Sequence, residues 1–299
     1  MRRFSKGELH PRRFFADTWR DIDRDADGHS AGSGSRDAAT TAYVFVVAAI
    51  CLTLSDLNYL GGEGAGAALI AFLDSPQSPH AHPFLWFLAG WMKPDDGPIL
   101  FSQWYELWQL GYWAIVKVIA YFVIPAIAIA VHPRLHWRDI GFSTEGLSSH
   151  ARLYALLFIP VFVAVVAVSF TEEFTTYYPF YFHATRSAFD FWIWELLYVA
   201  QFFSLEFFFR GFLLQPASRT MGSSSIVAMM IPYVMIHFGK PLPECFAAVL
   251  AGVVLGTLAL KTRSIWAGFF LHVSVALSMD VLSCLHRDGV GFLTTIIGR

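Results

Sequence analysis

The sequence has few charged residues. Asp, Glu, Lys and Arg make up 15% of its 299 residues, whereas a soluble domain carries about a quarter. The outer surface of the folded chain must therefore be largely apolar. A lipid bilayer is the environment in which such a surface is stable, so the composition excludes an ordinary soluble domain.

Three further features are missing. The basic residues form no block or stripe that could follow a phosphate backbone, and the net charge is −2, so we expect no nucleic-acid partner. Cys51, Cys245 and Cys284 lie in or beside apolar runs without CxxC spacing, which indicates small buried side chains rather than a disulfide framework. The HExxH motif of zinc hydrolases is absent.

Long apolar runs are abundant, and 56% of the residues are hydrophobic. The runs predict an all-α, polytopic transmembrane bundle of about seven spans, at about 41–60, 107–131, 151–170, 192–219, 225–238, 244–260 and 264–285. The pieces GAGAALIAFL and PFLWFLAGWM, between the first two runs, are too short to span a membrane and are expected to be interfacial or re-entrant.

Residues 1–40 are polar and contain the acidic stretch DIDRDADGHSAGSGSRD, so we expect a flexible tail. The tail is too long and too acidic for the start of a signal peptide, and the first apolar run is therefore expected to stay as a helix. With this tail in the cytoplasm, the loops at 134–138, 210–219 and 261–263 lie inside, and all are basic. The sequence thus predicts a multi-pass protein of the plasma or inner membrane with a cytoplasmic N-terminus.

Polar residues inside the spans need a reason, because one charge at the centre of a helix costs about 2.5–3.5 kcal/mol. Glu206 and Arg210 are four residues apart in SLEFFFRG, on one helix face. His237 ends the fifth run, and His272 lies inside the seventh. Each could be purely structural. Counting about 1.5 Å per residue from the predicted inner side, however, puts Glu206 and His237 at similar depth, and His272 within a helical turn or two of them.

A carboxylate and two imidazoles in one cavity could activate water and stabilise an oxyanion. Hydrolysis of an amide bond within the membrane is the reaction that this set favours. The same three residues could also hold a metal, so a zinc site is an alternative.

The segment from Trp192 to Asp280 resembles the CAAX protease and bacteriocin-processing (CPBP) family of intramembrane endopeptidases. The resemblance rests on LEFFFRGFLLQ, on IHFG and on GVVLGTLALKTRSIWAGFFLH. That family typically shows EExxxR on one helix, a His at the end of the next, and HxxxN or HxxxD on a later one. The order and spacing of all three motifs match.

The resemblance implies a glutamate-dependent protease with no obligatory metal or other cofactor. It implies catalytic roles for Glu206, His237 and His272 and a supporting role for Arg210. The sequence departs from the family pattern twice. Leu205 stands where the first glutamate is expected, and Ala276 stands where the last polar residue is expected.

Other acids could replace the missing glutamate. These alternatives are Glu195 on the fourth run, Glu244 near His237, and Asp280 beyond His272. Glu244 and Asp280 could equally be solvated residues near helix ends, and Glu195 could pair with another polar group.

We expect an endopeptidase that acts on membrane-anchored or exported proteins or peptides, with the bilayer as its other partner. One version removes C-terminal sorting anchors. The expected parts are a tail at 1–40, N-terminal transmembrane helices and loops at 41–191, a CPBP-like catalytic core at 192–285 and a C-terminal tail at 286–299. Two alternatives stay open: a catalytically inactive binding or immunity protein, and a proton-coupled transporter whose Glu and His form a relay.

Overall fold

The computed structural model describes residues 11–56, 104–144 and 151–297. Within these ranges the chain is helical and has no strand, only an isolated bridge between Phe142 and Ser264. The predicted all-α fold is therefore confirmed. The two short apolar pieces between the first two runs lie outside the described residues.

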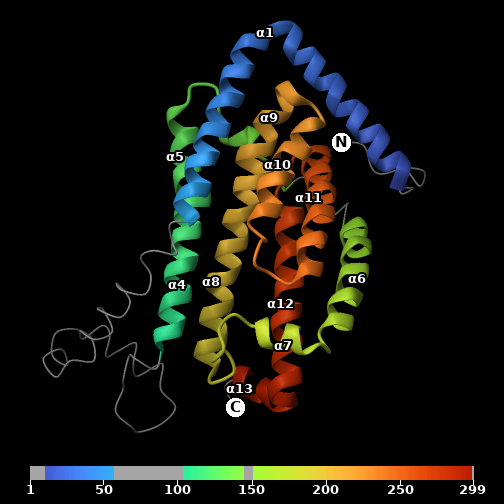
Figure 1. Cartoon of the computed structure of the whole chain (residues 1–299). Helices are drawn as coiled ribbons and strands as arrows, with labels where there is room; N and C mark the ends of the chain where they lie inside the picture. The colour runs from blue at the N-terminus through green and yellow to red at the C-terminus, as the bar shows by residue number, and fades with distance from the viewer. Residues whose placement is uncertain (1–10, 57–103, 145–150, 298–299) are drawn as a thin grey trace, which may run out of the picture.

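The helices follow the predicted runs (Figure 1). They are α1 (Pro11–Asp56), α4 (Tyr105–Val118), η3 (Ile119–Val123), α5 (Ile124–Val131), η4 (Trp137–Asp139), α6 (Ala151–Val168), α7 (Glu172–Tyr177), α8 (Ala188–Glu206), η5 (Phe207–Leu213), α9 (Leu214–Met221), α10 (Ser224–Met235), α11 (Leu242–Thr262), α12 (Trp266–Asp288), η6 (Gly289–Gly291) and α13 (Phe292–Ile297).

Length and apolar composition allow five of these segments to cross a bilayer. They are Gly34–Asp56, Tyr105–Val131, Ala188–Met221, Leu242–Thr262 and Trp266–Ile297. The remaining two predicted spans are shorter apolar helices, within α6 and at α10. The number seven thus describes five full-length spans and two short ones, and the protein is a multi-pass membrane protein.

The first part of α1, residues 11–33, differs from the expected flexible tail because it is helical. We call these residues the N-terminal arm. Figure 1 shows α1 bent over one end of the bundle, with the arm on the side of α9 and α11. Contacts distant in sequence hold the arm there: the Trp19 indole donates to the Thr257 hydroxyl at 3.0 Å, and the Ser223 backbone N–H donates to Asp23 at 2.7 Å. These contacts hold the arm in place, although its polar composition gives it few apolar side chains to bury.

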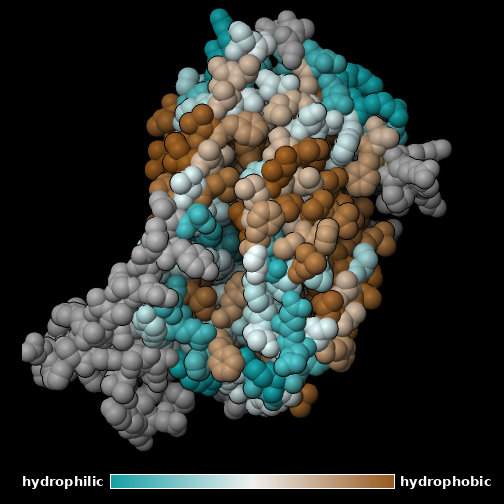
Figure 2. Space-filling view, viewed as in Figure 1, coloured by the Kyte–Doolittle hydropathy of each residue, from teal (hydrophilic) through white to brown (hydrophobic). Residues whose placement is uncertain are grey.

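Aromatic side chains fill the centre of the bundle. Phe207, Phe208, Phe209 and Phe212 are all buried, and the Phe208 ring stacks on Tyr121 with ring centres 4.9 Å apart. Figure 2 shows hydrophobic residues across the middle of one face and hydrophilic residues over the N-terminal arm and at the opposite end. A surface of this kind suits a bilayer around the middle of the bundle.

The predicted inner loops meet at one end of the bundle. The Ile265 N–H donates to the Gly141 carbonyl at 2.9 Å, and Arg219 pairs with Asp139 at 3.1 Å. Arg263 ends α11 with a positive φ of 53° and lies 3.8 Å from Asp25 of the arm. The basic loops that predicted a cytoplasmic side therefore lie together.

Candidate functional site

The site forms where α8 changes its winding. After Glu206 the chain continues as the π-helix η5, which carries Arg210, and returns to an α-helix at Leu214. Seven residues of π-helix are unusual, and π-segments inside α-helices occur frequently at functional sites. The acid and the arginine thus lie at the junction of two helix types.

Glu206 is fully buried. Its Oε1 lies 3.1 Å from Nη1 of Arg210 and 2.6 Å from Nδ1 of His272 on α12. None of these contacts is aligned as a hydrogen bond. Gly268, one turn before His272, makes room for the acid, because a Cβ added there would overlap the Glu206 carboxylate. The sequence therefore brings α8 and α12 close together at this level.

Tyr233 of α10 is the centre of the arrangement. Its hydroxyl lies 2.9 Å from Nε2 of His272, and its ring lies 4.1 Å from the Arg210 guanidinium carbon. The ring also packs edge-on against His237, with centres 4.8 Å apart. Tyr233 was not among the site residues predicted from the sequence. The available signal was its position four residues before His237, on the same helix face.

His237 follows α10 at its carboxyl end. Its Nδ1 lies 2.8 Å from the Tyr233 carbonyl oxygen, an atom that can only accept. In the neutral ring Nδ1 therefore carries the proton, and Nε2 is left as a lone pair. No hydrogen bond to Nε2 comes from the residues that the structure describes.

The charges of the site follow from Arg210. A guanidinium is always protonated in proteins, and this one is fully buried, so a counter-charge must lie beside it. Glu206 at 3.1 Å supplies that charge as a carboxylate. Arg210 and Glu206 then cancel, and a further proton on His272 would leave the buried group with a net positive charge.

Two of the alternative acids lie elsewhere on the helices that carry the site. Glu195 is 3% exposed, and Asp280 accepts from the Trp194 indole at 2.8 Å. Asp280 lies eight residues beyond His272, or about 12 Å along α12. Glu195 lies eleven residues before Glu206, or about 16 Å along α8. These two carboxylates are neighbours, and within the described ranges no ion pair or hydrogen bond joins either of them to His237 or His272.

The third alternative acid, Glu244, is held in an ion-pair cluster at the start of α11. Its Oε1 lies 2.5 Å from Nζ of Lys240, and its Oε2 accepts from the Tyr178 hydroxyl. Lys240 in turn lies over the Phe180 ring. Glu244 thus connects the turn after His237 to the loop after α7.

Both departures from the family pattern are buried apolar positions. Leu205 packs in the same aromatic cluster as Phe207 and Tyr121. Ala276 packs in a second cluster with Trp194 and Tyr198. Neither position faces a described polar partner.

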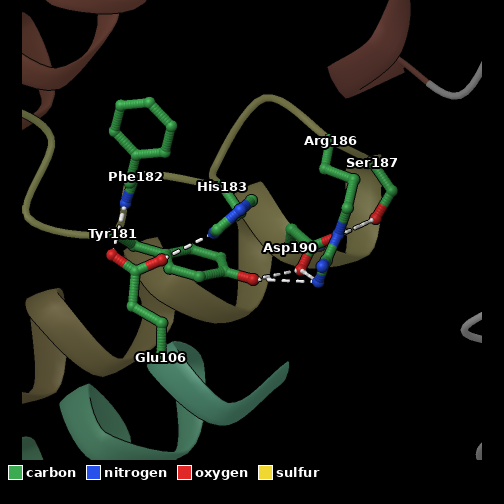
Figure 3. A network of polar contacts seen from close by, with 7 residues as sticks. All are labelled: Glu106, Tyr181, Phe182, His183, Arg186, Ser187 and Asp190. Carbon is green, nitrogen blue, oxygen red and sulfur yellow. Dashed lines mark hydrogen bonds and ion pairs between the residues drawn. The ribbon is translucent and has the colours of Figure 1, made fainter. Parts of the chain in front are cut away.

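A second polar network surrounds the first turn of α8 (Figure 3). Asp190 accepts from the Tyr181 hydroxyl at 2.5 Å, from Nε of Arg186 at 3.0 Å and from the Ser187 hydroxyl at 2.6 Å. Ser187 also caps the helix by accepting from the Asp190 N–H. Burial and the Asp190 carboxylate raise the pKa of Tyr181 above its usual range, so this phenol stays a donor.

The same loop joins α8 to α4. Glu106 accepts from the Phe182 N–H at 2.9 Å and lies 2.7 Å from Nδ1 of His183. This network fixes the amino end of α8, and the buried pair at Glu206 lies at its other end.

No metal site was found among the described residues, in which no three side chains of His, Cys, Asp or Glu lie close enough to hold an ion. Both ring nitrogens of His272 already face protein atoms. The three residues of the zinc alternative therefore do not form a ligand set in this conformation. Independence from metal stays a prediction.

Residues 186–278, about a third of the chain, match the family described as Type II CAAX prenyl endopeptidase Rce1-like. The resemblance inferred from the motifs is thus confirmed, and the match includes Glu206, Arg210, Tyr233, His237 and His272. No curated protein and no solved structure matches the chain.

Proposed function

We propose that the protein is an intramembrane endopeptidase of the CAAX type. The observation that carries this proposal is the buried Glu206 carboxylate, 2.6 Å from His272, inside the segment that matches the family. An acid and two histidines around one buried tyrosine are suited to proton transfer in a site from which water is largely excluded. The fold alone would not support this assignment.

His237 is the general base in this proposal. Its Nδ1 is occupied by a backbone carbonyl, which leaves Nε2 as the acceptor for a proton from water. The resulting hydroxide adds to the carbonyl carbon of the scissile peptide bond. The proton is then delivered to the amine as the carbon–nitrogen bond breaks, so that His237 returns to its neutral form.

Glu206, Arg210 and His272 form the fixed charge pattern beside this base. Glu206 and Arg210 are both fully buried, and the His272 side chain is 16% exposed, so the imidazole is the edge of the group that a substrate could reach. Because buried charges act in a low effective dielectric, this group stabilises charge in the transition state more than an exposed group would.

The substrates in this proposal are membrane-anchored or exported proteins cleaved near the bilayer surface, including C-terminal sorting anchors. The protein is placed in the plasma or inner membrane with the basic end, and hence the N-terminal arm, in the cytoplasm. The basic loops that gather at that end support this orientation.

A second candidate is a catalytically inactive family member that binds membrane proteins or confers immunity. Leu205 and Ala276 favour it, since both lie in apolar clusters at positions where the family has polar residues. The proton-coupled transporter ranks third, because the sequence shows no internal repeat with interrupted helices.

The test uses the full chain in liposomes with two quenched fluorescent peptides. One ends in a prenylated cysteine followed by three residues, and the other carries a transmembrane anchor. We expect cleavage of at least one peptide by the wild type, persistence of cleavage in chelator, and loss in His237→Ala. Uncleaved peptides in both cases would favour the inactive binding protein, and loss in chelator would restore the metal alternative.

A further inference from the structure

Tyr233 contacts both histidines and the arginine of the site. Its hydroxyl faces His272, its ring faces Arg210, and its backbone carbonyl faces His237. The side chain is 1% exposed. A phenylalanine would fill the same space, so the hydroxyl is the part that calls for an explanation.

The contacts of His272 determine its protonation. Glu206 is ionised, and an acceptor oxygen lies 2.6 Å from Nδ1. Two lone pairs would repel at that distance, so Nδ1 carries a proton. Since a net positive charge is disfavoured in this buried group, the ring is neutral and Nε2 is a bare acceptor. The Tyr233 hydroxyl at 2.9 Å is then the donor to Nε2.

We propose that Tyr233 is a positioning residue whose hydroxyl caps Nε2 of His272 and holds the ring neutral, with its Nδ1–H on Glu206. This inference rests on the proposed function for its role in cleavage. It also explains why the two histidines have different roles. The Tyr233 hydroxyl occupies Nε2, the acceptor nitrogen of His272, whereas Nε2 of His237 stays available as an acceptor.

The phenol also links the two histidines mechanically. The Tyr233 ring is in contact with His237. The backbone carbonyl of Tyr233, which lies four residues before His237 in the sequence, orients the His237 imidazole. A shift of α10 would therefore move His237 and uncap His272 together. Tyr233 thus couples the position of His237 to that of the His272–Glu206 pair.

The experiment compares the full chain with Tyr233→Phe after selective labelling of histidine with ¹⁵N. The His272 signals are identified by their absence in His272→Gln. In the wild type we expect one neutral form, protonated at Nδ1 and hydrogen-bonded at Nε2. In Tyr233→Phe we expect the Nε2 signal to shift to that of an unbonded nitrogen. Identical His272 spectra in both proteins would overturn the proposal.

Tyr121→Phe is the matched control, because this buried phenol is also hydrogen-bonded, at 2.9 Å to Ser55, and lies outside the site. We expect its His272 spectrum and its cleavage to equal those of the wild type. Tyr233→Phe should lower kcat about tenfold with KM unchanged, as expected for one lost neutral hydrogen bond. A change in KM alone would contradict the positioning role.

The two proposals fail in different ways. If the wild type cleaves nothing, the ¹⁵N spectra still show whether Tyr233 caps His272. If cleavage survives in His237→Ala while the Nε2 signal shifts in Tyr233→Phe, the capping is real and the assignment of His237 as the base is wrong.

Discussion

Two acid–arginine pairs of equal spacing and different character lie at the two ends of α8. Asp190 is in the first turn of α8 and Arg186 lies just before the helix; the Arg186 side chain is 31% exposed, and Asp190 receives aligned hydrogen bonds from several donors. Glu206 and Arg210 lie at the other end, both fully buried, at ion-pair distance but without aligned hydrogen bonds.

The difference in hydrogen bonding indicates different roles for the two carboxylates. A carboxylate whose lone pairs are all used is held in place and has little capacity left for a substrate. A buried carboxylate that lacks aligned donors still carries its negative charge in a low-dielectric environment. That charge can act electrostatically on a neighbouring imidazole. We therefore propose a structural role for Asp190 and a catalytic role for Glu206.

The largest effect is expected when each acid is neutralised. Glu206→Gln should lower kcat for peptide cleavage by about 10²–10³, the range associated with loss of one preorganised electrostatic group. Asp190→Asn should leave kcat unchanged. The measurement is cleavage by equal amounts of folded protein in liposomes. Equal losses in both variants would contradict the distinction between the two pairs.

The second effect concerns stability. Arg210→Met leaves Glu206 buried without its counter-charge and should lower the free energy of unfolding by about 3–5 kcal/mol. Arg186→Met leaves the buried Asp190 with the Tyr181 and Ser187 hydroxyls as donors, and should lower it by less, about 1.5–3 kcal/mol. Denaturant titration in detergent gives both values. The double variant Glu206→Leu with Arg210→Met should recover most of the stability, and a double variant as unstable as Arg210→Met would refute the pairing.

The third effect concerns the space that Gly268 provides. Gly268→Ala should lower the free energy of unfolding by about 1–3 kcal/mol, because the added methyl overlaps the Glu206 carboxylate and must displace it. Gly28→Ala is the control, since nothing lies within 4 Å of a Cβ at that position in α1. This control should gain up to about 1 kcal/mol from helix propensity. A neutral Gly268→Ala would show that α8 and α12 are farther apart than described.

The smallest effect is expected in the Asp190 network. Tyr181→Phe removes one of several donors to Asp190 and should cost about 0.5–1.5 kcal/mol of stability, with cleavage unchanged. Thermal unfolding in detergent checks the first part and the peptide assay checks the second. A large loss of cleavage in Tyr181→Phe would give this network a role in the reaction.

Much of the fold could be predicted because lipid imposes a simple rule on sequence. Apolar runs long enough to span must be helices, and each predicted run is one. The approach of Glu206 and His272 also followed from residue counts along regular helices. The roles of Glu206, His237 and His272 stay predictions.

The remaining features depend on contacts that no local pattern contains. The N-terminal arm is polar, and its helix is held by partners about two hundred residues away, such as Thr257. The π-helix at 207–213 contains five apolar or aromatic residues that would suit an α-helix equally well. Tyr233 counts as apolar in any hydropathy pattern, and only its packing against His272 shows that the hydroxyl is used.

The most direct test of the account is a comparison of new protein termini in whole membranes by mass spectrometry. The wild type would be compared with Glu206→Ala, His237→Ala and His272→Ala, and with Asp190→Ala as the matched acid, at equal expression. We predict termini that appear with the wild type and with Asp190→Ala and vanish in the other three. Wild-type membranes without new termini, or termini that persist in Glu206→Ala, would contradict the proposal of an endopeptidase that depends on Glu206.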